Sequence, residues 1–77
     1  MKNVDIIREF ARGAERGKCG NLSIIGDKLI NYRTVIAERV SDGVRLNTRK
    51  YSATTSRIQS LIRNNVNVVA TFEGAAL

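Results

Sequence analysis

The sequence contains one cysteine and no histidine, and this shortage of cross-linking and metal-binding residues constrains the fold more than any other feature. No internal disulfide can form, and the side chains that most often bind zinc are missing. The 77 residues must therefore fold around a hydrophobic core, although a chain this short buries only roughly 60% of the surface that it exposes when unfolded. Hydrophobic residues make up 43% of the sequence, which is near the globular norm. We predict one small domain over residues 1–77.

Two segments have apolar residues at the three- and four-residue spacing of an amphipathic helix. The first covers residues 2–16, with Asn3 as its N-cap, and ends at the glycine-rich turn that follows. The second follows a Lys-Tyr-Ser segment, is capped by Thr54 or Thr55, and ends at residues 64–65.

The remaining segments alternate with the period of two that is typical of strands. We predict strands at residues 21–25, 28–32, 34–40, 44–48 and 66–72. The expected fold class is α+β, a mainly antiparallel sheet of about five strands with two helices in the order α-β-β-β-β-α-β. One or both helices pack on a single face of the sheet, and the other face stays solvated. No element is assigned to residues 75–77.

The loop around Gly43 decides which side chains of the third and fourth predicted strands face the core. A two-residue turn at Asp42-Gly43 would pair Ser41 with Val44, whereas a three-residue turn with a left-handed Gly43 would pair Val40 with Val44. We prefer the three-residue turn, because it joins apolar side chains and places glycine where φ is positive. The inward residues are then Tyr32, Ile36, Val40, Val44 and Leu46. The outer row is Arg33, Arg39, Arg45, Asn47 and Arg49.

Positive charge is concentrated in the second half of the chain. The sequence has 13 basic and 7 acidic residues and a net charge of +6, and no acidic residue occurs from Gly43 to Phe72. Such a segment creates a positive field that attracts phosphates or an acidic protein face. The alternative is a solvated basic surface that serves solubility alone.

The residues for most catalytic chemistry are absent. Without histidine the commonest general base is missing, and the seven carboxylates are scattered rather than paired. The sequence has no phosphate-binding glycine loop followed by Lys-Ser or Lys-Thr, and no Gly-x-Ser-x-Gly elbow. Cys19 has no histidine partner, so we assign it a structural role. We predict a protein that is not an enzyme and has no catalytic residue, cofactor or metal.

Two features near the second predicted helix each permit two interpretations. The run Thr54-Thr55-Ser56, followed by Arg57, is either a helix cap or an anion site at the helix N-terminus, and the cap is favoured. Tyr51, between basic residues, is either a stacking residue for nucleic acid or an edge tyrosine packed on the core, and packing is favoured.

Two stretches resemble a known group of proteins. The run from Leu29 to Ala37 contains Tyr-x-Thr-x-x-Ala, and residues 50–56 read Lys-Tyr-Ser-Ala-Thr-Thr-Ser. Together they resemble a family of small uncharacterised proteins encoded by phages and prophages, over roughly residues 20–63. Members of that family carry a histidine where this chain has Ile58, so any role of that histidine does not transfer. The resemblance implies an accessory protein of a virus or mobile element and transfers no active site.

These observations lead to two function hypotheses. The first is a non-enzymatic phage-type accessory protein that binds and inhibits a host protein or ribonucleoprotein complex, such as a CRISPR or other defence machine. The second is a largely sequence-nonspecific binder of DNA or RNA. No segment is apolar enough for a signal peptide or a membrane span, so we expect a cytoplasmic protein of the infected host cell with no membrane partner. The oligomeric state stays open. The candidate binding residues are Arg33, Arg39, Arg45, Asn47, Arg49, Lys50, Tyr51, Thr54, Thr55, Ser56, Arg57 and Arg63.

Overall fold

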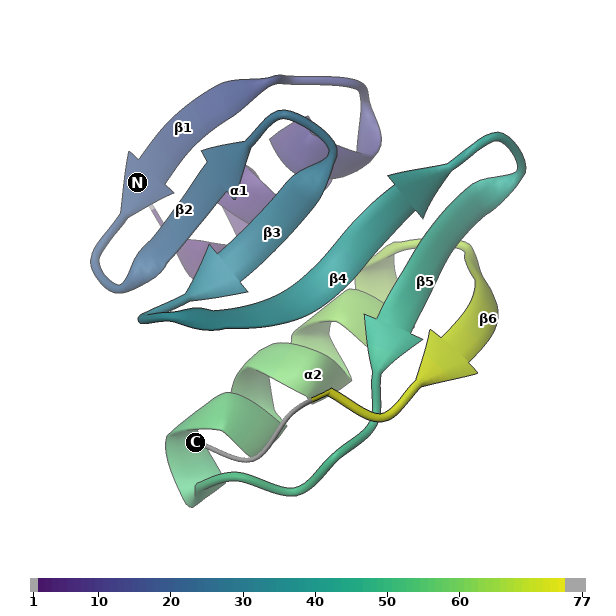
Figure 1. Cartoon of the computed structure of the whole chain (residues 1–77). Helices are drawn as coiled ribbons and strands as arrows, with labels where there is room; N and C mark the ends of the chain where they lie inside the picture. The colour runs from purple at the N-terminus through teal and green to yellow at the C-terminus, as the bar shows by residue number, and fades with distance from the viewer. Residues whose placement is uncertain (1, 75–77) are drawn as a thin grey trace.

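A six-stranded mixed sheet with two helices accounts for the described part of the chain (Figure 1). The structure is a computed structural model and describes residues 2–74. The strands lie side by side in sequence order; neighbours from β1 to β5 are antiparallel, and β6 is parallel to β5. The elements are α1 (Asn3–Ala11), β1 (Arg16–Cys19), β2 (Leu22–Ile25), β3 (Lys28–Asn31), β4 (Thr34–Val40), β5 (Gly43–Asn47), α2 (Ala53–Asn65) and β6 (Val68–Phe72).

The core lies between the two helices and one face of the sheet. In Figure 1, α1 lies against the half of the sheet that contains β1 and β2, whereas α2 crosses from β5 to β6. The helix is needed there because two parallel strands cannot be joined by a tight turn. The predicted α+β class is therefore confirmed. The buried apolar residues are Ile6, Ile7, Phe10, Leu22, Ile24, Leu29, Ile36, Ala37, Val44, Leu46, Ile58 and Ile62.

The first helix is shorter than the sequence pattern predicts, and a sixth strand takes its place. Helix α1 ends at Ala11, because Gly13 adopts a φ of +108° that does not continue a helix. Residues 16–19 then form β1, in which Gly17 approaches the Ile24 side chain so closely that a Cβ atom would lie 3.1 Å from it. The predicted N-cap was also wrong: Lys2 occupies that position, and its backbone N–H donates to the Asp5 carboxylate.

A β-bulge in β4 reverses the faces predicted for the residues that follow it, whereas Ile36 faces the core as predicted. Leu29 pairs with Ala37 and Ile30 pairs with Val35, so Ile36 is an extra residue in β4. Ile36 and Ala37 are both buried in the core. Beyond the bulge the alternation is shifted by one residue, and Arg39 therefore faces the helices. The prediction that Arg39 belongs to an outer row was wrong for this reason.

The turn between β4 and β5 matches neither predicted register. Val40 pairs with Gly43, which leaves Ser41 and Asp42 as a two-residue turn. Glycine is required at position 43 by a close approach, since a Cβ atom there would overlap the carbonyl oxygen of Asn67 just before β6.

Tyr32 was also placed wrongly by the sequence pattern. With Arg33 it forms the two-residue turn between β3 and β4, has a φ of +57°, and is 67% exposed. Its hydroxyl accepts a hydrogen bond from Asn21 Nδ2 at 2.7 Å. A bulky side chain rarely adopts this left-handed conformation, so the turn holds the ring outside the core at some conformational cost.

Arg39 clamps the end of α1 to the sheet. Its Nη1 atom donates to the carbonyl oxygens of Phe10 at 2.6 Å and Ala14 at 3.1 Å, and Nη2 donates to Gly26 at 3.1 Å. The guanidinium also lies 5.2 Å from the centre of the Phe10 ring. A cation at a helix C-terminus satisfies carbonyls that have no partner within the helix. Arg39 is therefore a structural residue.

We predict that Arg39→Ala lowers the free energy of unfolding by about 2–3 kcal/mol, because three carbonyl groups lose a charged donor. In a domain of this size the loss corresponds to a fall in Tm of roughly 10–20 °C, measurable by thermal denaturation. Arg39→Lys keeps the charge but not the several N–H donors of the guanidinium. Its Tm is expected to lie between those of the wild type and Arg39→Ala. An unchanged Tm in Arg39→Ala would contradict the clamp.

Candidate binding surface

The side-chain amide of Asn47, at the end of β5, is fully buried and makes four hydrogen bonds. Its Nδ2 atom donates to the Val35 carbonyl and to the Tyr51 hydroxyl, both at 2.9 Å. Its Oδ1 atom accepts from the backbone N–H groups of Arg49 and Gly74, both at 3.0 Å. One side chain therefore joins β4, the loop after β5, and the segment after β6.

A second set of polar contacts attaches this loop to α2. Gln59 Nε2 donates to the carbonyl oxygens of Asn47 at 2.7 Å and Arg49 at 2.9 Å. At the start of α2, the Ser52 hydroxyl accepts from the Thr55 N–H at 3.2 Å, and Asn31 Nδ2 donates to the Thr55 hydroxyl at 3.2 Å. The loop over residues 48–52 is thus held from both sides. We call these contacts the Asn47 network, made by Asn31, Asn47, Tyr51, Ser52, Thr55 and Gln59.

The network changes the interpretation of three predicted binding residues. Asn47 is 0% exposed and Thr55 is nearly as buried, so neither lies on a contact surface. The N-cap of α2 is Ser52 rather than Thr54 or Thr55. Tyr51 is half-buried with its hydroxyl on Asn47, which agrees with the packed interpretation. Asn47 and Thr55 were placed wrongly for one reason: their side chains make hydrogen bonds inside the molecule and do not reach solvent.

Three predicted cations are exposed on α2 or on segments that are bonded to it. Arg33 belongs to the β3–β4 turn, Lys50 to the loop, and Arg57 to α2 itself. The hydrogen bond between Asn31 and Thr55 joins the strand end that precedes Arg33 to the first turn of α2, and the bond from Gln59 to the Arg49 carbonyl holds the backbone next to Lys50 at the middle of the helix. Within residues 2–74 none of the three cations has an ion-pair partner. We call this surface the basic end, made by Arg33, Lys50, Thr54, Ser56 and Arg57.

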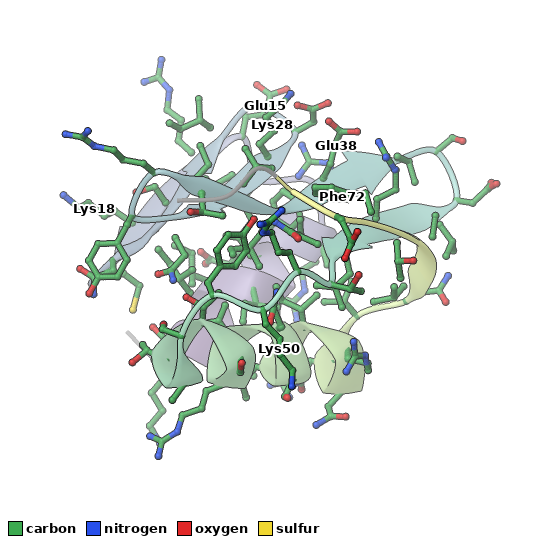
Figure 2. All side chains as sticks on the ribbon, turned by 60° about the horizontal axis from the view of Figure 1, so that its bottom comes forward. Glu15, Lys18, Lys28, Glu38, Lys50 and Phe72 are labelled. Atoms are coloured by element: carbon green, nitrogen blue, oxygen red, sulfur yellow. The ribbon has the colours of Figure 1, made fainter. Side chains whose placement is uncertain are left out.

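The charges on the open face of the sheet, in contrast, are largely compensated. Glu38 Oε1 accepts from Arg45 Nη1 at 3.0 Å, and Glu38 Oε2 lies 3.6 Å from Lys28 Nζ. The hydrogen bond to Asp27 and its charge, with a smaller effect of Glu38, raise the pKa of Lys28. Figure 2 shows Lys28 and Glu38 projecting on the side away from α2. Cross-strand register makes one row of Arg16, Ile25, Lys28, Glu38, Arg45 and Ala70.

The other predicted arginines do not join the basic end. Arg45 is engaged by Glu38 and lies 5.0 Å from the centre of the Phe72 ring. Arg49 is half-buried, with Nη1 donating to the Gly74 carbonyl at 3.2 Å. Arg63 is exposed near the far end of α2, about 9 Å further along the helix axis than Arg57. The sequence pattern did not identify Tyr32 as an exposed neighbour of Arg33. Its signal is the pair of residues between Asn31 and Thr34, a spacing that allows a two-residue turn.

Comparisons with known proteins give no relative for this chain: no family model, curated protein or solved structure matches it. Among residues 2–74, no three histidine, cysteine, aspartate or glutamate side chains are grouped so as to hold a metal ion. In the same part of the chain, neither helix has the length and apolar character needed to cross a membrane.

We predict that Asn47→Ala lowers the free energy of unfolding by about 2–4 kcal/mol, because it leaves several buried polar groups without partners. The matched control is Lys50→Ala, which removes an exposed side chain from the same loop and is expected to stay within about 0.5 kcal/mol of the wild type. Chemical denaturation of the three proteins measures both values. Equal stabilities for the two variants would show that the network does not hold the loop.

Proposed function

We propose that the protein acts by binding, without catalysis, as an accessory factor of phage type that inhibits a host nucleic-acid-handling or defence complex. The basic end makes the contact, and its target is an acidic face of a host protein or ribonucleoprotein. The observation that supports this proposal is the set of exposed cations on α2 and on the segments bonded to it, which have no acidic partner within residues 2–74. In this proposal the site of action is the cytoplasm of the infected cell.

The chemistry of the basic end favours a protein partner. Next to Arg33 lies the exposed ring of Tyr32, and tyrosine and arginine are among the side chains most enriched at interface hot spots. A platform for nucleic acid needs several rings on which successive bases stack, whereas Tyr32, next to the basic end, is the single exposed ring among the described residues. The net charge of +6 also argues against mimicry of DNA, which requires an acidic surface.

The attachment of the basic end to the rest of the fold supports the same proposal. Lys50 is in the loop that the Asn47 network holds, and Arg57 is on a helix whose first turn is bonded to β3. Side chains mounted on a fixed backbone lose less conformational entropy on binding than side chains of a mobile loop. The residues that the network buries therefore serve the contact indirectly, by positioning its exposed neighbours.

The first experiment captures partners from host lysate, with and without nuclease, and then measures affinity for the purified partner. We expect the triple variant Arg33→Ala, Lys50→Ala, Arg57→Ala to bind about 10–100-fold more weakly, since each exposed charge contributes a fraction of a kcal/mol to 1 kcal/mol. The control triple variant replaces Arg12, Arg16 and Lys18, which are also exposed. It removes the same charge from the end of α1 and from β1, outside the basic end, and is expected to bind nearly as the wild type.

Two outcomes of this experiment would contradict the proposal. Equal weakening by both triple variants would mean that net charge, and not the basic end, drives the association. Unchanged binding by the first variant would place the contact elsewhere. The Tm of each variant serves as the folding check, and both are expected to remain near the wild-type value.

The second candidate function is direct binding of DNA or RNA, and the acid-free segment from Gly43 to Phe72 favours it. The salt dependence of binding separates the two candidates. Three phosphate contacts give a slope of log affinity against log salt of about −2.7 on duplex or about −2.1 on single strands. A protein partner is expected to give a shallower slope, because salt reduces mainly the association rate. A steep slope with an isolated oligonucleotide of any sequence would favour the second function.

A further inference from the structure

Strand β6 leaves one edge of the sheet open. It is the last strand in the sheet order, so only β5 lies beside it within residues 2–74. The Phe72 carbonyl accepts from the Thr48 N–H at 2.8 Å and therefore points towards β5. Because backbone polar groups alternate sides along a strand, the N–H and C=O of the preceding residue, Thr71, point away from β5. An unpaired strand edge of this kind is a ready template for another strand.

The two edges of the sheet differ in how they are protected. Strand β1 carries the exposed cations Arg16 and Lys18, and charged residues on an edge strand oppose pairing with a second chain. Strand β6 has the sequence Val-Val-Ala-Thr-Phe, with no charge, no proline and no glycine, and its irregularity is a bulge at Val69 between the residues that pair with Val44 and Arg45. Its central residues are exposed, and Val69 is among the most exposed large apolar side chains of the described part of the chain, at 44%.

We propose that β6 pairs with β6 of a second copy of this chain, antiparallel and about a two-fold axis at Ala70. This register places Ala70 opposite its own copy and Val69 opposite Thr71, and beyond the bulge at Val69 it brings Asn67 near Glu73 of the second copy. A symmetric pair forms two equivalent sets of contacts from one surface, as two-fold dimers do. The two sheets then continue as one, and the Thr71 backbone groups gain partners.

The charges around β6 allow a second copy to pair at this edge. Two molecules that each carry +6 repel one another over most of their surfaces. Along β6 no like charges lie opposite one another in the proposed register. At each end the side-chain amide of Asn67 lies near the carboxylate of Glu73 of the second copy. The nearest arginine on β5, Arg45, is compensated by Glu38 at 3.0 Å. Self-pairing at this edge therefore avoids the repulsion that other parts of the surface would produce.

The test uses charges placed on the proposed two-fold axis. Analytical ultracentrifugation of the full chain, from about 10 µM to about 1 mM as suits a small interface, is expected to show a species of twice the 8.5 kDa monomer mass. Ala70→Lys and Ala70→Glu each place like charges opposite one another and are expected to weaken dimerisation at least about tenfold. An equimolar mixture of the two variants places opposite charges there and is expected to restore the dimer. Ser60→Lys on α2 is the matched charge control and should dimerise as the wild type.

Hydrogen exchange locates the contact. Protection of the Thr71 amide is expected to rise with protein concentration. Protection of the Phe72 amide, which points towards β5, should be the same at all concentrations. A wild-type protein that stays monomeric over the whole concentration range would overturn the proposal. This holds even if β6 were found to bind a strand of another protein. Dimerisation of Ala70→Lys or Ala70→Glu alone as strongly as the wild type would overturn it as well. The basic end is not involved, so its function is tested separately.

Discussion

The buried amide of Asn47 is the interaction on which the second half of the fold depends. The bulge at Ile36 shortens the pairing of β4 with β5, which ends at Ala37 and Leu46. The Val35 carbonyl lies beyond that end, and the Asn47 side chain supplies the donor that the ladder no longer provides. Because the same amide also binds the loop and the segment after β6, its loss would leave several buried polar groups unsatisfied at once.

This arrangement separates the residues that hold the structure from those that are free to make contacts. Arg39, Asn47 and Thr55 all look like surface binding residues in the sequence, yet each donates or accepts inside the molecule. The cations that stay exposed, Lys50 among them, gain a fixed position from their buried neighbours. A binding surface on a chain of 77 residues needs such support, since a core this small leaves little stability to spare for ordering mobile loops.

The elements with a regular apolar spacing could be predicted from the sequence. The prediction failed where a single residue interrupts that spacing. Helix α2 and the strands β2 to β5 follow from apolar spacing, and the α+β class follows from their order. Strand β1 was missed because Gly17 carries no side chain to continue the apolar alternation. Glycine fits this position because the Ile24 side chain packs closely against its backbone. The faces of β4 were reversed by a bulge that no local pattern marks. Since a shift of one residue exchanges the two faces of a strand, this single error placed Arg39 on the wrong side.

The segment over residues 50–56 combines residues that hold the loop with residues that face solvent. Of its residues, Tyr51, Ser52 and Thr55 belong to the Asn47 network, whereas Lys50, Thr54 and Ser56 face solvent. On the helix that follows, Ile58 lies in the hydrophobic core and Gln59 donates to two carbonyl oxygens of the loop. Packing at Ile58, these hydrogen bonds and the bond from Asn31 to Thr55 fix α2 against the sheet. Specificity in this chain is therefore expected from the solvent-facing members of the segment and from Arg33 and Arg57 beside them.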